Sequence, residues 1–574
     1  MVDHPESRTA AIQPAQLGGA TEPGNRQEAY RNSFGEGRLF LVVDSVPEMQ
    51  RAMGMTLSSF GAEKVEYANR ASDALSKMGR HDFDVVLCDY DLGNGYDGLY
   101  LFEEVKERNL IKQSCVFMIV TGERRAQRVI SAAELAPDDY LLKPFSGEKL
   151  SQRLSKAVRK RTAFRPIDEA IMRNEYLAAI EICNRKIAER GEFTLDFMKI
   201  KGTLSLRIGD FDTARSLYMD VLRIKDVPWA KLGLAKALTG LKAYDQARML
   251  FEEVLADNDR IMEAYDWLAR LHRDSGNLVE AQALLQKATD LSPVVIRRQK
   301  HLAEVAFMNN DLAVAEAACT ETLEIAKYTW HRSPNHYAML ARVQLAQGET
   351  GNASRTLGRL RRDFRYNQGG EWMADVIDSQ VQMHSGNGMR AEQVLKDAQE
   401  RFEQLAGELD PEAHMEFARA CYTQHNTHLG DQVMRGLVRN HHDDERMLIR
   451  LGNLFDEVGR GEVGRRLIAE NVQGVVDMNN LAVKDAQNGA YDAAIERFAR
   501  ALTEMPSNIQ IMLNLVNATM AYVHRNGWHE SYMRRASELL MKVRDIAPTN
   551  NKFQKQLQSW RLLTEKLGKP HWGL

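Results

Sequence analysis

The chain has 574 residues, more than a single hydrophobic core usually serves, so about two to four domains are expected. Its 76 Lys and Arg residues are balanced by 79 Asp and Glu residues. This balance argues against a protein that is held to nucleic acid by bulk charge. No segment approaches the roughly 18 consecutive apolar residues of a membrane-spanning helix, so no membrane span is expected.

Residues 1–36 are polar and poor in large apolar side chains. This stretch lacks the apolar centre of a signal peptide, and its composition is typical of a disordered tail. The five cysteines are far apart and form no C-x-x-C pair; they are Cys88, Cys115, Cys183, Cys319 and Cys421. Isolated cysteines of this kind indicate reduced thiols, so we expect a cytoplasmic protein.

Residues 37–160 alternate between strand-like and helix-like segments, which indicates one α/β domain. Five short apolar runs are the expected strands: 39–43, 64–68, 84–88, 115–120 and 139–143. Amphipathic stretches follow them at 47–60, 71–79, 97–107, 124–135 and 146–160. Runs such as "DVVLC" and "CVFMIV" are almost wholly apolar, as strands buried on both faces are. The pattern predicts a doubly wound, five-stranded parallel sheet with helices on both faces.

Polar residues follow four of these strands, where the carboxyl edge of the sheet should lie. Asp44 follows the first strand, Asp89 the third, Thr121 the fourth, and Lys143 ends the fifth. In such sheets the functional crevice lies at that edge, so we expect the four side chains to converge. Crowded carboxylates bind a hard divalent cation such as Mg²⁺, and a lysine pairs with phosphoryl oxygens. The set predicts a site that accepts a phosphoryl group on an aspartate.

The segment resembles the receiver domain of a two-component response regulator, through "LVVD", "VVLCDYDLGNGYDG", "IVTGE" and "DDYLLKPF" in that order. The resemblance implies a flavodoxin-like fold in which Asp89 is the phosphoacceptor. It makes Thr121 and Tyr140 the switch residues and Lys143 the phosphate-binding lysine, with the Lys143–Pro144 bond usually cis. It also implies a partner that supplies the phosphoryl group, either a cognate sensor histidine kinase or a phosphotransfer protein.

One position departs from the family pattern. Receivers usually carry two adjacent acids after the first strand, and the second is a direct metal ligand, but here Asp44 is followed by Ser45. The resemblance implies a Mg²⁺ ion held by Asp44 and Asp89, and Asp91 is a further candidate ligand that could supply part of the missing charge. Two interpretations stay open. The receiver is phosphorylated with a weakened Mg²⁺ site, or it is degenerate and serves only as a folded interaction module.

Gly93, Gly95 and Gly98 form a literal G-x-G-x-x-G motif. A dinucleotide fingerprint follows the first strand and opens directly into a helix, whereas this motif follows the third strand. The motif matches the loop that receivers place after the phosphoacceptor, where Asp97 would cap the next helix. We therefore interpret the glycines as part of a turn and not as a nucleotide site.

Residues 161–568 lose the strand pattern and consist of helix-like segments separated by turns. Similar hexapeptides such as "GDFDTA" and "GNLVEA" end at Ala214, Ala247, Ala281 and Ala315, with steps of 33, 34 and 34 residues. The series extends to Ala179, Ala353, Ala391, Ala494 and Ala536, and with looser spacing to Gly430 and Gly464. This period resembles the tetratricopeptide repeat and implies an α-solenoid of about ten helix–turn–helix units.

The chemistry of the unit fits this resemblance. The small residue lets two helices approach closely, and a glycine five positions before it, as at Gly209 and Gly276, permits the turn. An aromatic residue four positions after it, as at Tyr218 and Phe251, fills the space one turn on. Stacked units form a concave groove, so we expect an unidentified protein or peptide as its ligand.

Three further features of the sequence bear on metal binding, nucleic-acid binding and catalysis. The segment "HHDDE" (441–445) has metal-ligand residue types but falls between two repeats, where a solvated turn is expected. The basic segment 156–165 is expected to be a solvated helix face and linker, so nucleic acid is not an expected partner. No catalytic motif is present, which favours a non-enzymatic response regulator of a phosphorelay system. A phosphorylation-independent scaffold with a degenerate receiver is the alternative.

Overall fold

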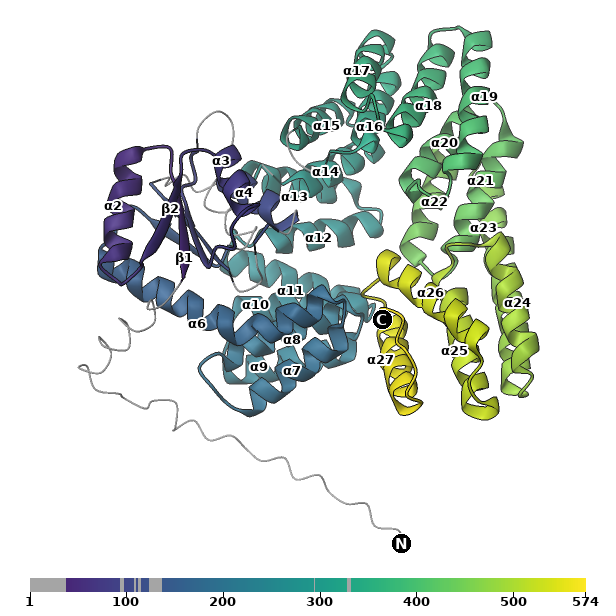
Figure 1. Ribbon diagram of the computed structural model, residues 1–574. Coiled ribbons are helices and arrows are strands. Elements are labelled where there is room, and N and C mark those ends of the chain that lie inside the picture. Colours follow the sequence, from purple (N-terminus) through teal and green to yellow (C-terminus); the bar gives the residue numbers. More distant parts are fainter. Residues whose placement is uncertain are drawn as a thin grey trace. The chain divides into compact units, whose positions relative to one another are not determined.

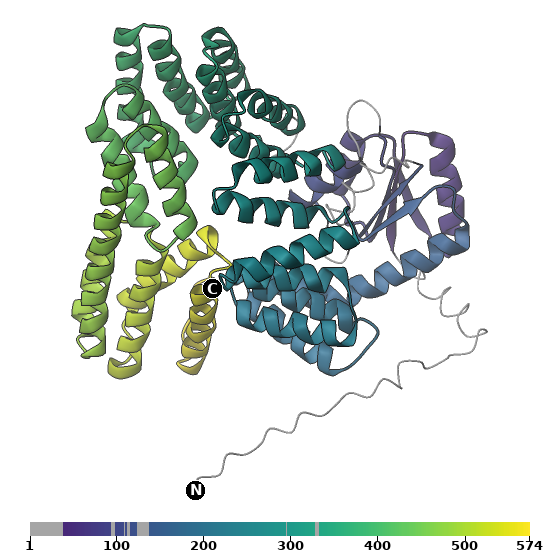
Figure 2. The same cartoon turned by 180° about the vertical axis from the view of Figure 1, so that it is seen from behind.

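A computed structural model describes residues 38–92, 98–107, 110–111, 115–122, 137–293, 295–327 and 332–574. These residues form two compact units. The N-terminal unit contains the described residues up to Gly122 and those from 137 to Arg165, and the C-terminal unit contains the described residues from Pro166 to Leu574. Figure 1 shows the elements of both units, and Figure 2 shows them from behind.

The N-terminal unit is built on the predicted five-stranded parallel sheet. Its strands are β1 (Leu39–Val43), β2 (Lys64–Ala68), β3 (Val85–Cys88), β4 (Val116–Thr121) and β5 (Asp139–Leu142). They lie in the order β2-β1-β3-β4-β5, and every neighbouring pair is parallel. The central strand β3 is buried along its whole length, which explains why its sequence is an uninterrupted apolar run.

Helices cover both faces of this sheet. Phe40 and Val42 of β1 pack on one face with α2 (Pro47–Ser58) and α6 (Gly147–Met172). Leu41 and Val43 pack on the other face with α3 (Ala71–Met78) and α4 (Gly98–Glu107). Alternate residues of one strand thus serve two cores, which confirms the doubly wound arrangement. The helix expected at 124–135 lies outside the described residues, as does the expected cap at Asp97.

Helix α6 continues beyond the position where the sequence predicted its end. A helix was expected at 146–160 and a linker after it, but α6 extends to Met172 and contains the boundary between the two units. Its apolar side chains continue at helical spacing, and Phe164, Ile167 and Ala170 are all buried. This continued burial is the physical reason why residues 161–172 are helical.

The C-terminal unit is entirely helical in the described residues. Its helices are α7 (Tyr176–Ala188), α8 (Thr194–Arg207), α9 (Phe211–Ile224), α10 (Pro228–Gly240), α11 (Tyr244–Asp257), α12 (Met262–Asp274), α13 (Leu278–Leu291), α14 (Ile296–Met308), α15 (Leu312–Ala326), α16 (Pro334–Ala346), α17 (Thr350–Asp363), α18 (Gln368–His384), α19 (Gly388–Leu405), α20 (Pro411–Thr423), α21 (Thr427–Asn440), α22 (Glu445–Glu457), α23 (Gly461–Gln487), α24 (Tyr491–Glu504), α25 (Ile509–Asn526), α26 (Glu530–Ile546) and α27 (Asn551–Lys566). Successive helices pack in pairs, as a solenoid of helix–turn–helix repeats requires.

The repeat register of the sequence corresponds to this packing. The alanines that set the period are fully buried on the second helix of each pair; among them are Ala214, Ala247, Ala281, Ala315 and Ala353. Glycines at the turns, such as Gly209 and Gly276, have φ angles of +76° and +82°, which a residue with a side chain adopts only under strain.

The two units that carry glycine in place of alanine have a steric explanation. A Cβ atom on Gly430 would lie 2.6 Å from the ring of Tyr422, and one on Gly464 would lie less than 3.0 Å from the ring of Phe455. Aromatic rings of the preceding helix therefore take the space that alanine occupies in other units. The 27-residue helix α23 joins the second helix of one unit to the first helix of the next without a turn, which shortens the step from Gly464 to Ala494.

The last helix of this unit contacts the first, because α27 packs against α7. The Gln554 side-chain oxygen accepts a hydrogen bond from the Tyr176 backbone N–H at 2.9 Å. Arg561 forms an ion pair with Glu175 at 2.8 Å. These contacts join segments almost 400 residues apart in the sequence, and no local pattern predicts them.

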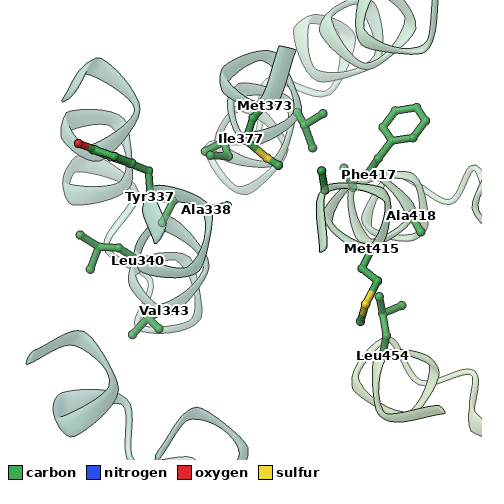
Figure 3. Packing of buried hydrophobic residues seen from close by; sticks show 14 of the residues in the cluster. Tyr337, Ala338, Leu340, Val343, Met373, Ile377, Met415, Phe417, Ala418 and Leu454 are labelled. Atoms are coloured by element: carbon green, nitrogen blue, oxygen red, sulfur yellow. The ribbon is translucent and has the colours of Figure 1, made fainter. Parts of the chain in front are cut away.

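The largest core of the unit runs from α12 to α23. Figure 3 shows part of it, in which Tyr337, Leu340, Met373 and Phe417 lie on neighbouring helices. Across the described part of the chain, helices that are both long enough and apolar enough to cross a membrane are absent.

Candidate functional site

The backbone of the sheet positions the predicted site residues. Asp44, Asp89 and Lys143 each stand one position beyond the last residue of a strand. Each still donates its backbone N–H to a neighbouring strand: Asp44 to Ala68 at 3.1 Å, Asp89 to Val43 at 2.8 Å, and Lys143 to Thr121 at 2.7 Å. The ladder thus continues for one more residue and fixes three side chains at the carboxyl edge of the sheet.

Lys143 joins the two carboxylates. Its Nζ donates hydrogen bonds to Oδ2 of Asp44 at 2.8 Å and to Oδ2 of Asp89 at 2.9 Å. Burial alone would lower the pKa of Lys143, but the hydrogen bonds that it donates to the two carboxylates, together with their charges, raise the pKa above its ordinary value. Lys143 is therefore protonated at neutral pH. Two carboxylates with one ammonium leave a net charge of −1, which a further cation would offset.

The two predicted switch residues, Thr121 and Tyr140, lie on β4 and β5. Tyr140 pairs with Ile119, two positions before the end of β4. Thr121 is the last residue of β4, is buried, and pairs in register with Leu142 of β5. Tyr140 is half-buried and packs against the core on the α3–α4 face. The structure thus brings Asp44, Asp89 and Lys143 into direct contact and holds Thr121 and Tyr140 on the two adjoining strands. The roles assigned to these residues stay predictions.

The proposed metal ligands have only oxygen donors. The carboxylates of Asp44 and Asp89 face one ammonium, and the hydroxyl of Ser45 lies 3.4 Å from the backbone carbonyl oxygen of Asp91. The Asp91 residue itself is exposed. Within the described ranges, no three His, Cys, Asp or Glu side chains are grouped closely enough to hold a metal. The donor chemistry fits Mg²⁺, with Ser45 offering a neutral oxygen where a charged one is usual.

Two neighbours of the site gave no recognisable signal in the sequence. Gln50 donates hydrogen bonds from Nε2 to the carbonyls of Asp44 at 2.7 Å and Ala68 at 2.9 Å, and so braces the loop after β1. A Cβ atom on Gly98 would lie less than 3.0 Å from the carbonyl oxygen of Asp89. Gly98 therefore permits close approach of α4 to the site, and Gly93 and Gly95 lie outside the described residues.

Two predicted solvated segments have structural roles instead. In "HHDDE", His442 is buried, with its Nδ1 3.0 Å from Nδ2 of Asn508, and Asp444 caps α22. The expectation of a solvated turn is therefore wrong for His442, because a distant segment covers it. On α6, Arg161 donates a hydrogen bond from Nε to the carbonyl of Cys115 at 3.3 Å, so part of the basic face is bound to the sheet domain.

Comparison with known proteins agrees with this geometry. Residues 40–155 match the response regulator receiver domain, and residues 232–296 and 267–328 match the tetratricopeptide repeat. The chain is 29% identical over 116 residues to the chemotaxis protein CheY-3 of Vibrio cholerae, covering 20% of this chain and 88% of that protein. It is 32% identical over 115 residues to the chemotaxis protein CheY1 of Helicobacter pylori, covering 20% of this chain and 91% of that protein.

Among solved structures, the C-terminal part of a TPR repeat-containing protein from Cytophaga hutchinsonii is 15% identical. It covers 44% of this chain and 98% of that chain, with a TM-score of 0.34.

The sheet order, the acidic edge and the repeated helix pairs define a signalling protein with a receiver and a helical repeat region. The chain belongs to the response-regulator family, and it carries its receiver domain at residues 40–155, followed by tetratricopeptide repeats. Both kinds of domain are generally non-catalytic modules for signalling and binding.

Proposed function

We propose that the protein is a response regulator of a phosphorelay system, phosphorylated on Asp89, whose output is binding of a partner protein by the repeat unit. The observation that carries this proposal is the contact of Lys143 with both Asp44 and Asp89 at the end of the central strand. A carboxylate at this place is reachable from the edge of the sheet, and the lysine beside it can pair with phosphoryl oxygens. A histidine kinase or a phosphotransfer protein would be the donor.

The transfer is a displacement at phosphorus. An oxygen of the Asp89 carboxylate attacks the phosphorus atom of a phosphohistidine on the partner. The P–N bond breaks, its electron pair stays with the imidazole, and an acyl phosphate forms on Asp89. Lys143, which remains protonated because of its raised pKa, pairs with oxygens of the transferred group. Asp44 keeps the lysine oriented through its own hydrogen bond.

Mg²⁺ suits the same edge, with Asp44, Asp89 and Asp91 as its candidate ligands. Ser45 lies beside them, with its hydroxyl 3.4 Å from the backbone carbonyl oxygen of Asp91. When bound, it would neutralise charge on the carboxylates and on the phosphoryl oxygens. Ser45 removes one negative charge from this set. We therefore propose a weaker Mg²⁺ site than two adjacent acids would give.

The proposed switch couples the acyl phosphate to the repeat unit. The hydroxyl of Thr121 would hydrogen-bond the new phosphate, and Tyr140 on the adjoining strand would move inward. Helix α6 follows β5 and includes residues of both units, so it is the proposed carrier of the change. The location proposed for this process is the cytoplasm, supported by five buried cysteines that form no disulfide.

A constitutive scaffold is the second candidate, and Ser45 is the observation that favours it. In that case the receiver is a folded docking module, and partner binding is independent of Asp89. Capture experiments with the full-length protein, with and without acetyl phosphate, separate the two candidates. A response regulator changes its set of captured proteins only when Asp89 is intact. Asp89→Asn should abolish the change, while Asp82→Asn, at an exposed acid of the same unit, should preserve it.

Identical capture by the wild type and Asp89→Asn under both conditions would support the scaffold and overturn the proposed switch.

A further inference from the structure

A charged cavity lies inside the C-terminal unit. It has a volume of about 660 Å³ and is lined mainly by the first helices of five helix pairs, α12, α14, α16, α20 and α22. Eight Arg or Lys residues and five Asp or Glu residues line it, which gives a net charge of +3 with histidines neutral. The whole chain has a net charge of −3, so the cavity is opposite in sign to the protein that contains it.

Most of the acids in the cavity are already paired by arginines or lysines of neighbouring helices. Glu416 accepts hydrogen bonds from Arg342 at 3.1 Å and Arg419 at 2.6 Å. Arg419 also contacts Glu457 through two hydrogen bonds of 3.0 Å. In the same way Glu412 contacts Arg450 and Lys300. These pairs join α14, α16, α20 and α22, so this part of the charge serves the structure of the repeats.

Two arginines of the cavity lining, on different helices, differ from the rest. Arg270 on α12 and Arg446 on α22 both line it, and within the described chain neither guanidinium is hydrogen-bonded or ion-paired to a carboxylate. The guanidinium of Arg270 is held over the ring of Trp267, 5.2 Å from its centre. Burial, and next the charge of Arg446, lower the pKa of Arg270 to about 10. At neutral pH two like charges therefore face one space. The charge of Asp274 also acts on Arg270, but Asp274 is itself ion-paired with Arg273 at 2.8 Å.

The cavity also has an apolar side. Met308, Met339, Met415, Ile449 and Leu454 all line it. Figure 3 shows Met415 of α20 and Leu454 of α22 with their side chains directed toward each other. Methionine side chains are flexible and adapt to ligands of different shape. The site therefore offers two cations beside an adaptable apolar surface.

We infer that this cavity binds an acidic peptide segment of a partner protein, with carboxylates of the peptide between Arg270 and Arg446. Adjacent apolar side chains of the peptide would contact the methionine-rich side. The inference rests on the protein-binding role proposed above for the repeat unit, and it specifies the chemistry of the ligand. Carboxylates between the two guanidinium groups would remove their repulsion and form charge-assisted hydrogen bonds.

A peptide fits these observations better than a nucleic acid. A nucleic-acid backbone carries a phosphate at every nucleotide and needs a continuous track of cations. Here Glu412, Glu416 and Glu457 interrupt the arginines along the cavity and would repel such a backbone. An acidic peptide can place single carboxylates at Arg270 and Arg446 and present apolar or neutral residues elsewhere.

The test is a selection from a library of short random peptides on the full-length protein, followed by fluorescence anisotropy on the enriched sequences. The wild type should enrich peptides that combine Asp or Glu with apolar residues. Arg270→Glu and Arg446→Glu should each weaken their binding about tenfold or more, which corresponds to ~1.4 kcal/mol. The control Arg465→Glu reverses an exposed arginine that does not line the cavity, and should leave binding unchanged.

Arg446→Gln provides a second readout that does not depend on the peptide. Because the two arginines repel each other, removing one charge should keep or raise the melting temperature of the unliganded protein. A lower melting temperature would show that Arg446 is a structural partner and would overturn the inference. Failure to enrich acidic peptides, binding that Arg270→Glu does not weaken, or preferential displacement of the peptide by oligothymidylate would overturn it as well.

These failures are distinguishable from failure of the proposed function. Acidic peptides that depend on Arg270 but bind equally with and without acetyl phosphate would support the inference and count against the phosphorylation switch. Phosphorylation-dependent capture of partners that is unaffected by Arg270→Glu would support the switch and overturn the inference.

Discussion

Replacing Gly202 with alanine should loosen the repeats formed by α8, α9 and α10. A Cβ atom at this position would lie 2.5 Å from Cζ and 2.6 Å from the hydroxyl oxygen of Tyr218. The Tyr218 ring, on α9, is only 2% exposed. A Cβ atom on Gly233 of α10 would also lie less than 3.0 Å from this ring. The ring is thus enclosed between two glycines and has no free space into which it can move.

The expected free-energy change combines two opposing effects. Alanine is favoured over glycine inside a helix by about 1 kcal/mol. Overpacking of a buried site costs about 1–3 kcal/mol. Because the ring is confined, we expect the steric cost to prevail, with a net loss of up to ~2 kcal/mol for Gly202→Ala. Gly358→Ala is the matched control, since Gly358 is an exposed glycine inside α17 with no atom near its Cβ position, and it should stabilise the protein by up to ~1 kcal/mol.

Thermal unfolding and hydrogen exchange measure both changes. Gly202→Ala should lower the melting temperature of the C-terminal unit and speed exchange in α8, α9 and α10, while exchange in the described residues of the N-terminal unit stays unchanged. Equal stabilisation by Gly202→Ala and Gly358→Ala would refute the reasoning, because it would mean that the space around Tyr218 readily accepts a methyl group.

Three further changes test other parts of the structure. Ala281→Leu should overpack the fully buried helix crossing at α13 and lower the free energy of unfolding by about 1–3 kcal/mol. The control Val279→Leu, at a residue 65% exposed on the same helix, should be nearly neutral. Unchanged hydrogen exchange across 230–330 in Ala281→Leu would contradict the repeat register. Ser45→Asp should tighten Mg²⁺ binding in calorimetric titration because it adds a ligand charge, and an unchanged affinity would mean that another group already completes the site. Burial alone would raise the pKa of Glu175, but hydrogen bonds from Arg561 and Arg173 lower it below 4.5. The ionised Glu175 carboxylate therefore stabilises the fold above pH 4.5, and the stability advantage of the wild type over Glu175→Gln should disappear as the pH falls well below 4.5. An advantage that persists in acid would show that it does not come from the ionised carboxylate.

The sequence predicted much of the fold because the decisive signals are local. Strands buried on both faces read as apolar runs, and a residue directly after such a strand must lie at the edge of the sheet. This reasoning predicted that Asp44, Asp89 and Lys143 lie at one edge of the sheet, and in the structure Lys143 contacts both carboxylates. The period of buried alanines likewise follows from one helix crossing in each unit.

What the sequence did not predict depends on contacts between distant segments. Gln50 braces Asp44 only because the loop after β1 folds back, and nothing marks this glutamine among the polar residues of α2. The burial of His442 requires Asn508, and the joining of α7 and α27 requires Gln554. Arg270 and Arg446 likewise face one cavity through the path of the solenoid and not through any motif.

The central claim is that Asp89 accepts a phosphoryl group, and intact-mass analysis after incubation with acetyl phosphate and Mg²⁺ tests it most directly. We predict a single phosphoryl addition that is stable in acid and labile in base, and that is present in the wild type and in the Asp82→Asn control but absent in Asp89→Asn. Lys143→Ala should retain the carboxylate but reduce the extent of labelling, because the cation that faces the incoming phosphoryl oxygens is removed. No addition to the wild type even at high Mg²⁺, or an addition that persists in Asp89→Asn, would contradict the account.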